Sequence, residues 1–194
     1  ENLSSTPQDR RELMDLVERM QNAFTTIAKS KVPTIALAHG FCIGGATSLV
    51  SACDIRLATK DAKFSIGETK LGLVADVGVI QRMPKIVSSG DMNELALTGR
   101  IFDGEHAERI RFVSKAYDNS DELFEAGEKL ANEISSNSKR IVQATKQALE
   151  KSSNLTIDQG LEYAKLWSTS FLVSEDLREG VMAFLEKRDP KFNE

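Results

Sequence analysis

The chain has 194 residues, of which 41% are hydrophobic and 28% are charged, and its formal net charge is −4. This length allows one globular core, with or without a helical appendage. The basic residues form no arginine-rich stripe, so we expect no nucleic-acid binding, and the apolar runs are too short for membrane insertion. Cys42 and Cys53 are too few for a disulfide framework and lack metal spacing, so we predict no metal site and two small buried thiols.

A long amphipathic helix is predicted near the start of the chain. Thr6 suits the N-cap and Pro7 the first helical position. Six apolar side chains then recur at helical spacing: Leu13, Leu16, Val17, Met20, Phe24 and Ile27.

A β–α–β rhythm follows and favours an α/β fold. The run "VPTIALAHG" predicts a strand buried on both faces, and "GGATSLVSAC" predicts a tightly packed helix. The stretch "CDIRLATKDAKFSIGE" predicts two short strands, broken at Lys60 and Asp61. A helix over "SSGDMNELALTGR" should end at Gly99. From Phe102 onward the pattern is mostly helical, over residues 104–110, 120–135, 139–151, 157–171 and 175–188.

The stretch "HGFCIGGATSLVSACD" places Gly44 and Gly45 between a strand and a helix. Glycine lets the backbone approach a ligand closely, and the helix aims its free N–H groups and positive dipole end at the turn. Such a turn suits a phosphate, a carboxylate or a developing oxyanion. The GxGxxG and GK[ST] elements are absent, so the turn alone also fits a simple tight connection.

Two acids follow in an apolar, glycine-rich segment. The stretch "FSIGETKLGLVADVG" contains Glu68 and Asp76. Carboxylates in such surroundings suit proton transfer near neutral pH. The alternatives are a surface acid at Glu68 and a helix N-cap at Asp76.

Other catalytic candidates are weaker. His39 borders the glycine turn without a Ser–His–Asp order, so it is interpreted as structural, and Ser48 lacks a GxSxG setting. His106 lies in a polar helical stretch and is expected to be solvated.

These stretches together resemble the crotonase, or enoyl-CoA hydratase/isomerase, superfamily. The match includes "KVPTIALAHGFCIGGATSLVSACDIRLATKDAKFSIGETKLGLVADVG", "RMPKIV", "ALTGRIFDGEHA" and "SEDLREGVMAFLEKRDPKF". The resemblance implies a spiral of β–β–α turns, followed by a helical C-terminal region that builds trimers, often paired into hexamers. Residues 1–99 would belong to the spiral, whose N-terminal strands are not in this sequence, and residues 100–194 to the helical region. We therefore expect the chain to be a fragment.

The resemblance also implies a site for an acyl-CoA thioester, with self-association as the other partnership. Two backbone N–H groups hold the enolate oxygen in the superfamily; the second matches Gly45, and the first comes from an earlier loop. Ile43, Gly44 and Ser48 would line the same turn. Toward the C-terminus, Phe184 and Lys187 match a region that often approaches the CoA nucleotide. An amphipathic helix with solvated basic residues would explain these two equally well.

The acids point to one branch of the superfamily. The stretch "GETKLGLVADVGVIQRMPK" resembles the dienoyl-CoA isomerases, where Glu68 and Asp76 match the two acids. Ser48 stands where that branch usually has aspartate and where hydratases have glutamate.

The implied activity moves a 3,5-diene to a 2,4-diene in fatty-acid β-oxidation. Removing a proton at C2 and adding one at C6 divides naturally between two carboxylates, and we favour Asp76 as base and Glu68 as acid. The alternatives are a Δ3,Δ2-enoyl-CoA isomerase that uses Glu68 alone, an enoyl-CoA hydratase, and a non-catalytic acyl-CoA-binding homologue. No cofactor is expected, and the resemblance implies a mitochondrial or peroxisomal location.

Overall fold

The computed structural model describes residues 7–192. They form two compact units, one of residues 7–30 and 34–127, the other of residues 31–33 and 128–192. Each unit is described by itself. The predicted division at residue 99 into spiral and helical regions stays a prediction about the superfamily's architecture.

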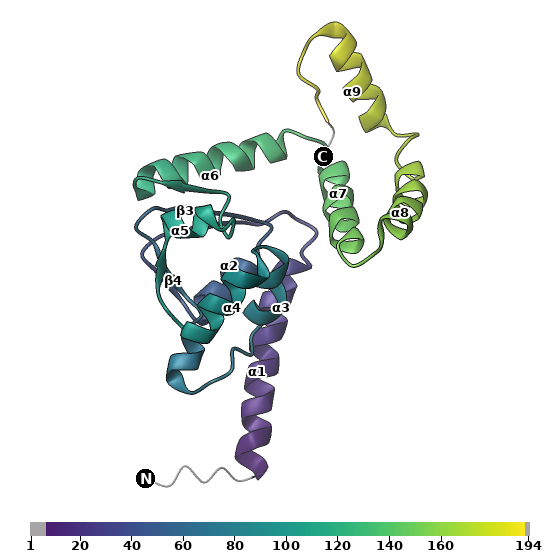
Figure 1. Cartoon of the computed structure of the whole chain (residues 1–194). Helices are drawn as coiled ribbons and strands as arrows, with labels where there is room; N and C mark the ends of the chain where they lie inside the picture. The colour runs from purple at the N-terminus through teal and green to yellow at the C-terminus, as the bar shows by residue number, and fades with distance from the viewer. Residues whose placement is uncertain (1–6, 193–194) are drawn as a thin grey trace. The chain divides into compact units, whose positions relative to one another are not determined.

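The first unit begins with helix α1, Pro7–Ala28, which starts at the predicted proline (Figure 1). The predicted cap Thr6 lies outside the described residues. The apolar face of α1 is only partly covered, because Leu13 is 57% exposed and Leu16 46%, whereas Phe24 is half-buried.

Two three-stranded sheets form the centre of this unit. The first has the order β1-β3-β6 and is parallel; its strands are Ile35–Ala38, Ile55–Thr59 and Lys115–Tyr117. The second has the order β2-β4-β5, with β2 and β4 parallel and β5 antiparallel; its strands are Phe41–Ile43, Lys63–Ser65 and Phe102–Asp103. The predicted break at Lys60 and Asp61 is confirmed. The prediction that β1 is buried on both faces was wrong. Only Ala38 of this strand is buried, because β1 pairs with β3 alone and is an edge strand.

Helices of different lengths connect these strands. They are α2 Gly45–Ser51, η1 Gly67–Leu71, α3 Val79–Arg82, η2 Met83–Lys85, α4 Ser89–Thr98, α5 Gly104–Arg109 and α6 Ser120–Ser135, which runs on into the second unit. Ser88 and Asp103 cap α4 and α5 through side-chain oxygens. Gly99 ends α4 in the left-handed conformation, as predicted.

An aromatic cluster fills the core of the first unit. The ring centroid of Phe64 lies 5.5 Å from that of Phe102 and 5.5 Å from that of Phe112. Cys42 belongs to this core, and burial raises the pKa of its thiol to about 11. Cys53 is only half-buried, so the prediction of two buried cysteines was right for one of them.

The second unit consists mainly of helices α7 Lys139–Ser152, α8 Ile157–Thr169 and α9 Glu175–Glu186. Their positions agree closely with the predicted ranges. Helices α7 and α8 pack side by side (Figure 1), and the Trp167 indole N–H donates to the Ala144 carbonyl at 3.0 Å. Among residues 7–192, no helix has the length and apolar content needed to span a bilayer.

Candidate functional site

The paired strands β2 and β4 bring the predicted site segments together. In this parallel pair Ile43 lies opposite Ser65, so the segments that follow the two strands leave the sheet at the same edge. Gly44 and Gly45 follow β2, and Glu68 follows β4 in helix η1. Parallel pairing therefore places the glycine turn beside the first candidate acid.

The glycine turn has a conformation that suits glycine. Gly44 has φ 57° and ψ −116°, and its N–H donates to the Ser65 carbonyl at 2.9 Å. Gly45 begins α2, so its N–H has no acceptor within the helix. No described side-chain or remote backbone atom lies within 4 Å of the position that a Cβ on Gly45 would occupy. The turn therefore offers the Gly45 N–H to a ligand and keeps the Gly44 N–H for the sheet.

The carboxylate of Glu68 lies against this turn. Its Oε1 is 3.4 Å from the position that a Cβ on Gly44 would occupy. Its Oε2 is buried and has no hydrogen-bond partner among the described residues. The surface-acid interpretation of Glu68 is therefore wrong. A buried carboxylate oxygen without a partner is rare in proteins, which makes Glu68 a candidate functional residue.

Ser48 lies one helical turn after the glycines and is completely buried. Its N–H donates to the Gly44 carbonyl at 3.1 Å. Its Oγ has no partner among the described residues. Both Ser48 and Glu68 therefore keep a buried oxygen unused near the same turn.

Asp76 lies on the loop that follows η1 and is exposed. The Gln21 side-chain amide of α1 donates to the Asp76 carbonyl at 2.6 Å. Gly78, not Asp76, is the N-cap of α3, so the capping alternative for Asp76 is wrong. The Asp76 carboxylate therefore does not cap helix α3.

Arg82 also links this loop to α1. Its guanidinium donates to the Val77 carbonyl at 3.3 Å and to Thr25 Oγ1 of α1 at 3.1 Å. Gly78 has φ 114°, and a Cβ there would lie 1.9 Å from Arg82 Nη1. The loop that carries Asp76 therefore depends on this glycine and on α1.

Three of these positioning residues were not found from the sequence. The buried Thr47 donates through Oγ1 to the carbonyls of Cys42 at 2.6 Å and Ser65 at 3.0 Å, which ties α2 to both strands. Gln21 and Arg82 act across long sequence separations, and no local pattern marks such bonds. For Thr47, no local signal distinguishes its hydroxyl from those of Ser48 and Ser51 in the same helix.

The remaining predicted residues differ in their surroundings. Ile43 ends β2 and is 39% exposed beside the turn. Phe184 is 82% exposed near the end of α9, and Lys187 is the left-handed C-cap of that helix, so their contact with CoA stays a prediction. His39 is exposed and makes an edge contact with Phe124, in keeping with a structural role. His106 is half-buried, so the expectation of a solvated side chain was wrong.

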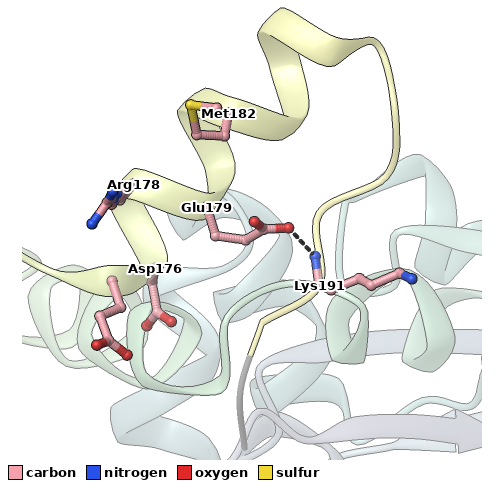
Figure 2. A pocket seen from close by; sticks show the side chains of 6 residues that line it. Asp176, Arg178, Glu179, Met182 and Lys191 are labelled. Atoms are coloured by element: carbon pink, nitrogen blue, oxygen red, sulfur yellow. Dashed lines mark hydrogen bonds between the residues drawn. The ribbon is translucent and has the colours of Figure 1, made fainter.

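A cavity of about 270 Å³ lies against α9 in the second unit. Figure 2 shows Glu179 pointing toward the main chain of Lys191, whose N–H it accepts at 2.6 Å. Glu179 also binds Arg188, which donates through Nη1 at 2.6 Å. Asp176 accepts from Ser138 Oγ at 2.7 Å. Glu179 holds the C-terminal segment and Asp176 binds the N-cap of α7, so both acids have structural partners and the cavity is not our candidate active site.

The residues of the first unit therefore combine an N–H donor at a glycine turn, a carboxylate against that turn and a second carboxylate on an anchored loop. This arrangement is suited to stabilising a developing oxyanion while protons move. No group of three or more His, Cys, Asp or Glu residues that could hold a metal ion is found within residues 7–192.

A two-sheet α/β core with an oxyanion-type turn and an adjacent acid defines an acid–base enzyme class within the crotonase fold. Residues 6–194 match the family model for enoyl-CoA hydratase/isomerase, and the chain belongs to that family. A solved enoyl-CoA hydratase from Bacillus anthracis superposes with a TM-score of 0.88 at 26% identity, covering 97% of this chain and 72% of that one. The predicted superfamily and fold class are confirmed.

Two similar relatives carry a more specific name. The mitochondrial Δ(3,5)-Δ(2,4)-dienoyl-CoA isomerase of Dictyostelium discoideum is 47% identical over 97% of this chain, and the match spans 64% of that protein. The peroxisomal enzyme of the same name from Arabidopsis thaliana is 41% identical over 97% of this chain and 69% of that protein. The chain thus spans about two thirds of the length of these relatives.

Proposed function

We propose that this chain carries the acid–base centre of a dienoyl-CoA isomerase, which converts a 3,5-dienoyl-CoA into the 2,4-dienoyl-CoA. The observation that carries the proposal is the placement of Glu68 against the Gly44–Gly45 turn, with its Oε2 buried and unpartnered. The identity with relatives that bear this name supports the same reaction.

The reaction removes a proton from C2 and delivers one to C6. Loss of the C2 proton leaves a dienolate whose charge spreads to the thioester oxygen, and the Gly45 N–H donates to that oxygen. Asp76 is the base and Glu68 the acid, because two carboxylates can serve carbons that are several bonds apart. Asp76 gains the C2 proton as Glu68 delivers one to C6, and proton exchange with solvent then returns both carboxyl groups to their starting states. The cycle consumes no electrons, so it requires no redox cofactor.

Ser48 takes the place of the usual acid in this proposal. Its hydroxyl can donate to a substrate or carboxylate oxygen, but it cannot hold and return a proton as a carboxyl does. Hydration normally uses an acid at this position, so water addition should be slow. Ser48 and Ile43 then shape the substrate side of the turn.

The surroundings of the reaction are part of the same proposal. The substrate is an acyl-CoA thioester, and a mitochondrial or peroxisomal location follows the names of the two relatives. Self-association as a trimer or hexamer is supported by the exposed apolar side chains of the second unit, which include Ile157, Leu161, Leu166, Val173 and Phe184. Phe184 and Lys187 are assigned to CoA binding.

The test uses the full-length protein and a 3,5-dienoyl-CoA, and it follows the ultraviolet absorbance of the conjugated product. Glu68→Gln should abolish the absorbance rise, and Asp76→Asn should slow it by about 100-fold or more, the usual loss for a general acid or base. Asp61→Asn changes an exposed acid of the same unit and is the matched control. An undiminished rate in Asp76→Asn would refute the two-acid assignment.

A second candidate is a Δ3,Δ2-enoyl-CoA isomerase that uses Glu68 alone. The exposure of Asp76, compared with the buried Oε2 of Glu68, favours keeping this alternative. It predicts that a 3-enoyl-CoA reacts faster than a 3,5-dienoyl-CoA and that Asp76→Asn retains this activity. A protein that binds acyl-CoA but turns over neither substrate would instead be the non-catalytic homologue.

A further inference from the structure

A second cavity, of about 520 Å³, lies in the first unit where β4, β5 and α5 meet. Four basic side chains line it: Lys63, Arg100, His106 and Arg109. Its volume is in the range of small-molecule sites in proteins. This cluster of basic side chains contrasts with the net charge of the chain, which is −4.

The cavity shares no lining residue with the candidate active site. Lys63 begins β4 and is paired with Phe41 at the start of β2. Gly44 and Glu68 follow the opposite ends of the same two strands. Arg100 and Ile101 precede β5, which runs antiparallel to β4, so the cavity extends along the sheet from Lys63 toward the end of β4 at Ser65.

The histidine in this cavity is held as a hydrogen-bond donor. Arg109 Nη2 lies 2.7 Å from His106 Nδ1, and a guanidinium can only donate, so Nδ1 accepts. The neutral ring then carries its proton on Nε2. Burial lowers the pKa of His106, and the charges of Arg109 and Arg100 lower it further, which keeps the ring neutral at pH 7.

One carboxylate, Asp103, also lines the cavity, and a second, Glu94, lies beside Arg100. Asp103 accepts the His106 backbone N–H at 2.9 Å and caps α5. Glu94 pairs with Arg100 Nη1 at 2.5 Å, which leaves other N–H groups of that guanidinium for a ligand. The cavity thus presents donors from three cations and a neutral imidazole, while the buried Phe102 and the 57% exposed Ile101 add apolar surface.

We propose that this cavity is a binding site for a small organic phosphate, distinct from the acyl-CoA site. Guanidinium groups bind phosphate oxygens through two parallel hydrogen bonds, and Lys63 and the His106 N–H complete a ring of donors. The apolar surface at Ile101 and Phe102 accommodates the organic part of the ligand. This proposal holds whether or not the chain is an isomerase.

The test is calorimetric titration of ADP into the full-length protein saturated with an acyl-CoA, so that the CoA site is filled. One ADP should bind per chain, more weakly at high salt, and uncharged adenosine should not bind. Arg109→Gln and Lys63→Gln should each weaken ADP binding by about tenfold or more, because each removes a charge-assisted contact. Arg11→Gln, on the exposed face of α1, is the matched control and should bind normally.

Inorganic pyrophosphate tests what the site recognises. It should bind in the same cavity and compete with ADP, because the phosphates provide most of the contacts. The side chains of Lys63 and Arg109 are at least partly exposed, so both variants should fold. A melting temperature equal to that of the unmodified protein would confirm this. Absence of ADP binding, loss of binding when acyl-CoA saturates the protein, or equal binding in both variants would overturn the proposal.

Discussion

Replacement of Gly44 by alanine tests whether the glycine turn supplies an N–H to the reaction. A Cβ at Gly44 would lie 3.4 Å from Glu68 Oε1, which is an ordinary van der Waals contact, so a steric clash contributes little. The backbone is the problem, because φ 57° with ψ −116° is unfavourable for alanine. Such strain costs about 1–3 kcal/mol.

This strain predicts both a stability effect and a rate effect. The free energy of unfolding should fall by about 1–3 kcal/mol, which a typical domain survives. If the turn relaxes to escape the strain, the Gly45 N–H leaves its position in most molecules. The same energy corresponds to about a 5- to 150-fold loss in kcat, within the range seen when an oxyanion donor is removed.

Gly40→Ala is the matched control, because Gly40 has φ 64° and no described neighbour within 4 Å of its Cβ position. It should show a similar loss of stability in urea unfolding but nearly normal isomerase activity. The reasoning is refuted if Gly44→Ala is destabilised like Gly40→Ala and yet keeps the same kcat.

Three further predictions follow from other contacts. Gln21→Leu should slow isomerisation without abolishing it, because it removes only the hydrogen bond to the Asp76 carbonyl and leaves Glu68 in place. An unchanged kcat would contradict this positioning role of Gln21. Thr47→Val should lower the free energy of unfolding in urea by about 1–3 kcal/mol, since its two carbonyl partners lose a buried donor; a neutral result would show that the strands hold α2 without it. The hydrogen bonds from Arg188 and from the Lys191 N–H lower the pKa of Glu179 to about 2. Their contribution to stability is complete above pH 4.5 and is lost as the pH falls toward 2. NMR titration of Arg188→Ala should show this pKa rise toward its ordinary value without reaching it, because the Lys191 N–H bond remains, and an unchanged pKa would contradict the pairing.

The sequence allowed the order of elements to be predicted well where the signal was local. Helical periodicity and caps placed α6, α7 and α9 close to their observed ends, and Gly99 marked the end of α4. The two strands around Lys60 and Asp61 were likewise predicted from a local break. Burial was predicted less well, because β1 is an edge strand here and an apolar run does not say how many neighbours a strand has.

The sequence indicates candidate site residues, whose roles stay predictions, but it does not indicate the contacts that support them. Glu68 and the glycine turn could be inferred from residue types and from family resemblance, whereas their proximity depends on the pairing of β2 with β4. The bonds of Thr47 and Gln21 join segments that are distant in the sequence, and one sequence carries no record of such pairs. The partial burial of His106 was also not predicted; its ring lies 5.7 Å from that of Phe102, on the short strand just before its helix.

The two acids are held by separate parts of the structure. Glu68 is positioned by the end of a short parallel strand pair and by the turn itself, all within a small stretch of the core. Asp76 is positioned by Gln21 and Arg82, which link its loop to α1. Changes in α1 can therefore move one acid while the oxyanion turn and the other acid keep their geometry.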